Sequence, residues 1–79
     1  MSFQGWSALS SYQTLVDYQG GTNPVYVGMA QPGQAADFPA WQIKKIIYDT
    51  NGNPTAVRYA AGTTDFVAIW DERTTYTYA

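Results

Sequence analysis

The chain has 79 residues, enough for one domain with a modest hydrophobic core. Six acidic and four basic side chains give a net charge of −2, too few bases for the positive stripe of a nucleic-acid-binding protein. The absence of histidine and cysteine removes the commonest general base, disulfide cross-links and the usual zinc ligands. Small domains without such cross-links are commonly stabilised by oligomerisation, so we expect this domain to be stable chiefly within an assembly.

Residues 1–10 are predicted to form an N-terminal arm, followed by a single β domain over residues 11–79. The arm carries Phe3, Trp6 and Leu9 in a segment too short for a stable isolated helix. Two interpretations stay open: the arm lies on its own domain, or it docks on a neighbouring subunit. The chain has no apolar run long enough for a membrane span and no secretory signal pattern, so we expect no membrane partner.

Alternating apolar and polar residues predict two strands in the first half of the chain, at residues 11–18 and 24–30. A cluster of turn-forming residues at 20–24 separates them. Gly28 lies inside the second strand, where a glycine indicates a bulge or the close approach of another segment. Residues 31–40 form the longest connection, and long loops are frequent contact regions, although no ligand motif is recognisable in this one.

The segment 41–59 gives the strongest hairpin signal, because two apolar runs flank a short polar turn. Asn51 and Gly52 are the predicted turn residues, since both tolerate the positive φ that a tight reversal needs. We predict a three-residue loop that begins at Thr50, with a bulge beside it.

Loop length decides which side chains share a face, because side chains alternate along a strand. A three-residue loop places two sets of side chains on one face, which are Trp41, Ile43 and Ile47 from the first strand and Val57, Tyr59 and Ala61 from the second. A two-residue loop would set the same isoleucines against Ala56, Arg58 and Ala60. We predict the first register, in which Lys44 lies opposite Arg58.

The hairpin turn has a superficial similarity to a calcium-binding loop. An EF-hand loop needs a glycine at its sixth position and a carboxylate at its twelfth. Counted from Asp49, Gly52 is the fourth residue and Ala60 is the twelfth. We therefore interpret the segment as a plain turn and expect neither a metal nor a cofactor.

After the hairpin, Phe66, Ile69 and Trp70 are spaced like one face of a short helix, predicted near residues 65–72. The last residues alternate tyrosine and threonine, which predicts a fifth strand at a sheet edge. The expected fold is mainly β: a small antiparallel barrel or rolled sheet of about five strands with one short helix.

Catalytic residues are not recognisable in the sequence. Asp65, Asp71 and Glu72 come nearest to a carboxylate pair, but on a helix they point in different directions and are typical of a capped, solvated helix. The serines have no histidine to activate them. We predict that the chain is not an enzyme and has no small-molecule substrate.

The aromatic residues divide into two groups. Trp41 and Trp70 lie in phase with aliphatic neighbours and are predicted core residues. Four tyrosines form either an exposed face suited to binding or cross-strand pairs that stabilise the sheet: Tyr26, Tyr48, Tyr76 and Tyr78.

Four spaced motifs occur in one order from Tyr26 to the end of the chain: YVGxAxPG, WxIKxIxYDxNGN, AxG before DF, and IWDxRxxYxY. This run, about two-thirds of the chain, resembles small uncharacterised structural proteins of tailed bacteriophages. The first twenty-odd residues do not share the resemblance.

The resemblance implies a virion protein that acts by protein–protein assembly, as a capsid decoration, neck, tail or fibre component. The expected partners are other virion proteins and further copies of the chain, and nucleic acid is not expected among them. The candidate interface residues are Phe3, Trp6, Leu9, Tyr76 and Tyr78. Two alternatives stay open: a host-surface binding module that uses loops and exposed tyrosines, and a small intracellular phage protein that inhibits a host factor.

Overall fold

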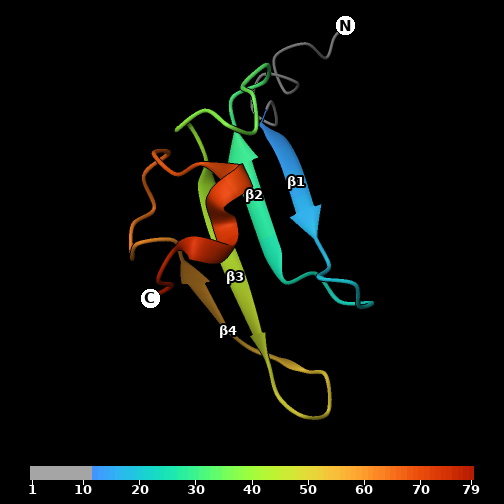
Figure 1. The fold of residues 1–79 in the computed structure, drawn as a ribbon. Coiled ribbons are helices and arrows are strands. Elements are labelled where there is room, and N and C mark those ends of the chain that lie inside the picture. The colour runs from blue at the N-terminus through green and yellow to red at the C-terminus, as the bar shows by residue number, and fades with distance from the viewer. Residues whose placement is uncertain (1–11) are drawn as a thin grey trace, which may run out of the picture.

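The computed structural model describes residues 12–79, which contain one antiparallel sheet and one short helix (Figure 1). The strands lie side by side in chain order: β1 (Gln13–Asp17), β2 (Tyr26–Ala30), β3 (Gln42–Tyr48) and β4 (Pro54–Tyr59). A 3-10 helix, η1 (Trp70–Thr75), follows them. The mainly β prediction is confirmed, whereas the predicted arm with Phe3, Trp6 and Leu9 lies outside the described residues.

The predicted five strands and barrel are not confirmed, because the described sheet has four strands and stays open. Tyr78 makes a single antiparallel bridge with Ala60, and Ala79 exchanges two backbone hydrogen bonds with Tyr59. The C-terminal residues therefore cover only one end of β4. Closure would need the first and last strands to meet, but within residues 12–79 β4 pairs with β3 and the end of the chain and not with β1.

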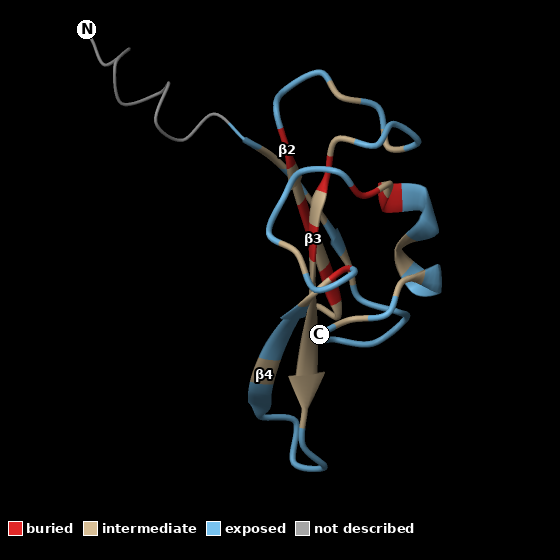
Figure 2. Cartoon of the chain, turned by 90° about the vertical axis from the view of Figure 1, so that its left-hand side faces the viewer, coloured by how far each residue is buried: buried red, intermediate tan, exposed pale blue. Residues whose placement is uncertain are grey.

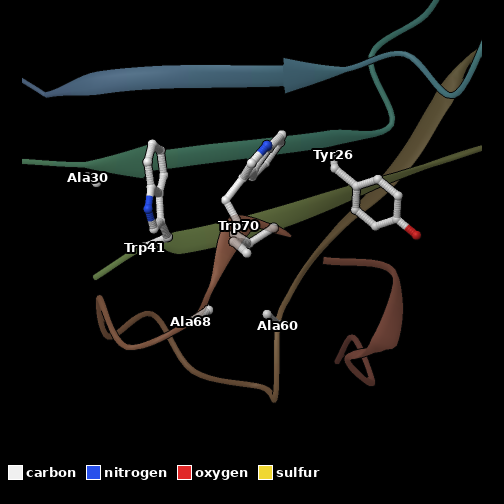
Figure 3. Close-up of a cluster of buried hydrophobic side chains, with 7 residues drawn as sticks. Tyr26, Ala30, Trp41, Ala60, Ala68 and Trp70 are labelled. Carbon is white, nitrogen blue, oxygen red and sulfur yellow. The ribbon is translucent and has the colours of Figure 1, made fainter. Parts of the chain in front are cut away.

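One face of the sheet, here called the inner face, is packed against η1 and the connections around it (Figure 2). Trp41 and Ile43 are the largest fully buried side chains, and Trp41 donates its indole N–H to the carbonyl of Ala35 at 2.9 Å. The prediction that Trp41 and Trp70 are core residues is confirmed (Figure 3). The other buried residues are small or aromatic: Tyr26, Ala30, Ala60 and Ala68.

Gly28 in the middle of β2 explains how two tryptophans fit over so small a sheet. A Cβ at this position would lie 2.5 and 2.7 Å from Cε3 and Cζ3 of Trp70, and 3.2 Å from Cε3 of Trp41. The two indole rings are neighbours, with centroids 6.1 Å apart. Of the two interpretations of this glycine, the structure shows a close approach and no bulge in β2, and the approaching group is the indole side chain of Trp70.

The predicted three-residue turn of the hairpin is confirmed. Asp49 N–H donates to the carbonyl of Asn53 at 2.9 Å, and Gly52 N–H donates to the carbonyl of Asp49 at 3.1 Å. Gly52 has a φ of +84°, the left-handed conformation that glycine adopts without steric cost.

Beyond the turn, the predicted register is wrong by one residue. Thr55 has no residue paired with it in the β3–β4 ladder, and this bulge shifts all the pairs that follow. Those pairs are Ile47–Ala56, Ile46–Val57, Lys45–Arg58 and Lys44–Tyr59. Since a shift of one residue exchanges the faces of a strand, Val57 points away from the inner face and the small side chain of Ala60 enters the core.

The helix predicted near residues 65–72 begins later, at Trp70, and is a 3-10 helix. Ala68 and Trp41 exchange two backbone hydrogen bonds of 2.9 Å each, which hold the chain extended up to the start of η1. Tertiary pairing therefore overrides the helical spacing of the apolar residues.

We predict that Gly28→Ala lowers the free energy of unfolding by about 1–3 kcal/mol, because the added methyl group overlaps the packed ring of Trp70. Chemical denaturation followed by tryptophan fluorescence measures this loss. Gly21→Ala is the matched control, since its Cβ would meet only the Tyr18 carbonyl at 3.4 Å. Equal stability of the two variants would contradict the importance of this contact.

Candidate functional site

The face of the sheet opposite η1, here called the outer face, is the candidate functional surface. Alternation along the paired strands assigns ten strand side chains to it: Thr14, Val16, Val27, Met29, Gln42, Lys44, Ile46, Tyr48, Val57 and Tyr59. Only Lys44 among them is charged. Val57 is 52% exposed, and the rest of the set is exposed or half-buried. The outer face is therefore mostly apolar and accessible.

The chain itself covers one end of the outer face. Residues 61–67 lie on the side of the sheet opposite η1 (Figure 2). The Gln42 side chain donates to the carbonyl of Thr64 at 2.8 Å, and Phe66 stacks on Tyr12 with ring centroids 5.5 Å apart. Phe66 and Trp70, which the helical spacing placed on one face, thus lie on opposite sides of the sheet.

The other end of the sheet is a two-stranded ribbon. β2 begins at Tyr26, opposite Lys45, so the remainder of β3 extends beyond it together with β4. Ile46 N–H still donates to the carbonyl of Val25 at 2.8 Å, and the Tyr48 hydroxyl donates to a loop carbonyl at 2.6 Å. The hairpin then projects from the body of the protein (Figure 1). A two-stranded hairpin in water is marginally stable, so this segment would gain from a covering partner.

The inner face holds one ion pair, which joins β1 to η1. Nε of Arg73 lies 2.7 Å from Oδ2 of Asp17, and its guanidinium lies over the Trp70 ring, 4.6 Å from the centroid. The backbone N–H of Gln19 donates to Asp17 at 2.9 Å and, together with Arg73, lowers the pKa of this carboxyl below its usual value. The arrangement holds η1 against β1.

The four tyrosines considered for a binding face belong to the protein's own packing. Tyr26 is buried, and Tyr48 bonds to the loop before β2. The Tyr76 hydroxyl accepts from the backbone N–H of Ile69 at 2.8 Å, and the Tyr78 hydroxyl donates to the carbonyl of Arg73 at 2.7 Å. Burial raises the pKa of Tyr78, and the nearby tyrosines add to this effect. A role of Tyr76 and Tyr78 in assembly stays a prediction.

The remaining polar candidates form no recognisable binding site. Asp49 accepts hydrogen bonds of 2.9 Å from the backbone N–H groups of Asn51 and Asn53, which lower its pKa and close the turn. Across residues 12–79, no three side chains of metal-binding type cluster together. The described helix is too short and too polar to cross a bilayer.

Comparisons with protein-family models, curated proteins and solved structures return no match to this chain. The outer face is therefore characterised by its own geometry. The predicted register placed Val57 on the face of Ile43 and Ile47, and the bulge at Thr55 moved it onto the outer face. The Asp17–Arg73 pair had no sequence signal, because its members are separated by 56 residues.

We predict that Asp17→Asn lowers the free energy of unfolding at neutral pH by about 1 kcal/mol. A carboxyl with a lowered pKa contributes stability above its unfolded pKa, about 4, and loses it as the pH falls through the folded value. Wild-type stability should therefore decrease below about pH 4 more steeply than that of the variant.

Urea denaturation at a series of pH values measures this difference. Asp37→Asn, the same change in the exposed 31–40 loop, controls for the loss of one negative charge. Asp49 supplies part of the remaining acid sensitivity, because its pKa is also lowered. Identical acid profiles for wild type and Asp17→Asn would contradict the contribution of the ion pair.

Proposed function

We propose that this chain is a non-enzymatic structural protein of a bacteriophage virion and acts by protein–protein assembly. The observation that supports this most is the outer face, a sheet surface with apolar side chains and a single charged one, Lys44. Interface cores are depleted of charged residues, and this surface has the same property. The resemblance of residues 26–79 to small phage proteins supports the virion setting.

The difference between the two faces of the sheet also favours assembly over catalysis. The inner face is closed by the protein's own tryptophans, η1 and the Asp17–Arg73 pair. The accessible outer face offers apolar area and backbone edges, and Lys44 is its one charged strand side chain. Such a surface suits another protein better than a small polar substrate, which needs several convergent polar groups.

The projecting end of the hairpin supports the same function. Ile46, Ile47 and Val57 place apolar side chains on both faces of a ribbon that no third described strand accompanies. If this ribbon packed against a neighbouring protein, its apolar side chains would be buried and the ribbon would be stabilised. The proposed partners are other virion proteins and further copies of the chain.

Quantitative mass spectrometry of purified phage particles tests the virion assignment. We expect many copies of the chain in each particle, because a protein that assembles through broad apolar surfaces repeats across a shell or a ring. Few copies, confined to fibre tips, would favour host-surface recognition instead. Absence from the particle would overturn the proposal.

We predict that Val57→Lys impairs incorporation into particles, while the free energy of unfolding changes by less than about 0.5 kcal/mol. Val57 is largely exposed on the outer face, so a new charge there has little to disrupt within the monomer. Thr74→Lys adds the same charge to an exposed position of η1, on the other side of the sheet, and should incorporate normally. Complementation of a phage that lacks the wild-type copy measures incorporation, and equal incorporation of both variants would count against the outer face.

A further inference from the structure

We propose that two copies of this chain pair through the outer edges of their β1 strands, antiparallel and about a two-fold axis. The proposal rests on the assembly function above and deepens it, because it names one interface and the partner that occupies it. It follows from a contrast between the two edges of the sheet, from the exposed side chains of β1 and from the self-complementarity of its sequence.

The β4 edge carries several features that prevent pairing with another strand. Pro54 has no backbone N–H to donate, and Thr55 forms the bulge. The backbone of Tyr59 is already bonded to Ala79, and Ala61 N–H donates to the carbonyl of Thr77 at 2.8 Å. Proline, bulges and covering segments are the usual means by which natural sheets avoid edge-to-edge association.

The β1 edge has none of these features in the described part of the chain. Gln13–Asp17 pairs with β2 in unbroken register, without a bulge, and the strand contains no proline and no basic residue. Its one charged residue, Asp17, is engaged with Arg73 on the inner face. No described residue pairs with the outer edge of β1. Among residues 12–79, nothing occupies this edge, so a second strand can pair with it.

The direction of the backbone groups of β1 follows from the rest of the ladder. Ile46 N–H donates to the carbonyl of Val25, and hydrogen-bonding direction alternates from one residue to the next. Lys44, two residues before Ile46, therefore also bonds towards β2, where its partner is Val27. The next residue, Gly28, directs its backbone N–H and C=O groups the other way, at its β1 partner Leu15. Thr14 and Val16 direct their N–H and C=O groups outwards, where a second strand can bond to them.

The large side chains beside this edge are exposed. Tyr12 is 44% exposed, Val16 is 43% exposed and Tyr18 is 48% exposed, and all three belong to the outer-face alternation of β1. Most of the chain's large hydrophobic residues are better buried than these. A second strand at this edge would cover them.

The sequence of β1 is complementary to itself when Leu15 lies on the two-fold axis. Thr14 then pairs with Val16 of the partner subunit, which gives four backbone hydrogen bonds in all. Tyr12 lies opposite Tyr18 of the partner subunit, and cross-strand aromatic pairs are favourable. On the inner face, Gln13 lies opposite Asp17 of the partner subunit, so no like charges meet. A register centred on Asp17 would set two carboxylates face to face.

Five-residue strands bury little area, so we expect a reversible dimer in the free protein and stronger association within an assembly.

Thr14→Pro tests the pairing at its centre. A proline is tolerated on an edge strand where the N–H faces solvent, so the fold should persist while an intermolecular donor is lost and the pyrrolidine ring blocks the approach. We expect the dissociation constant of the dimer to rise about tenfold or more. Val57→Pro is the matched control, because it makes the same change at an outward N–H of the other edge.

Sedimentation equilibrium of the full chain measures the association, with circular dichroism as the check on folding. The proposal is supported if wild type and Val57→Pro dimerise and folded Thr14→Pro does not. A wild type that stays monomeric up to about 1 mM overturns it. It is also overturned if Thr14→Pro dimerises like wild type, or if removal of residues 1–10 abolishes a dimer that Thr14→Pro leaves intact.

Single cysteines decide the outcome if Thr14→Pro fails to fold, because the chain has no natural cysteine. Leu15→Cys places two thiols across the axis at about 4.5 Å between Cα atoms, within the range of a disulfide. We expect mild oxidation to yield a covalent dimer of Leu15→Cys and not of Val57→Cys. Equal cross-linking of the two variants overturns the proposal.

The particle experiment separates this proposal from the proposed function. A chain present in many copies per particle but monomeric and not cross-linked at β1 leaves the virion role standing and rejects the dimer. A chain absent from particles that still dimerises through β1 rejects the virion role and leaves the dimer standing.

Discussion

The contact between Trp70 and Gly28 is the interaction on which the rest of this structure depends. The buried core holds two indole rings and one large aliphatic side chain, Ile43. Trp70 reaches β2 only because position 28 has no side chain. Once seated, it carries Arg73 to Asp17 and brings Tyr76 and Tyr78 against the sheet. The space left by the absent Cβ of Gly28 therefore lets Trp70 hold the C-terminal segment against the sheet.

Because the C-terminal segment is held by Trp70, the two faces of the sheet are covered unequally. The last twenty residues are used on the inner face and on one end of the outer face, and little of the described chain is left to cover the remainder. Residues 12–79 leave the outer face, the β1 edge and the projecting half of the hairpin uncovered together. Apolar surface of this kind is costly in an isolated protein, and a protein that functions within an assembly gains from it.

Sequence reasoning succeeded where the signal is local and failed where distant segments compete. Four strands and the turn at Asn51-Gly52 follow from alternation and backbone preference, which act over a few residues. The register beyond the turn did not follow, because one unpaired residue, Thr55, reverses every face assignment after it. The helix begins at Trp70, later than predicted, because Ala68 pairs with Trp41, a residue that precedes the hairpin in the chain. The hydroxyl partners of Tyr76 and Tyr78 are backbone groups that only the folded chain presents.

The sequence by itself determined the class of the protein: a small, sparsely charged, aromatic-rich β domain without histidine or cysteine, built around one hairpin with a glycine turn. These properties are set by residue types and their short-range spacing. The tertiary structure alone decided which face is closed, which edge is open and which tyrosines are consumed by the core. Those outcomes depend on the bulge at Thr55, on the contact of Trp70 with Gly28 and on the Asp17–Arg73 ion pair, whose members are 56 residues apart in the sequence. Each of these features forms only when the whole chain has folded.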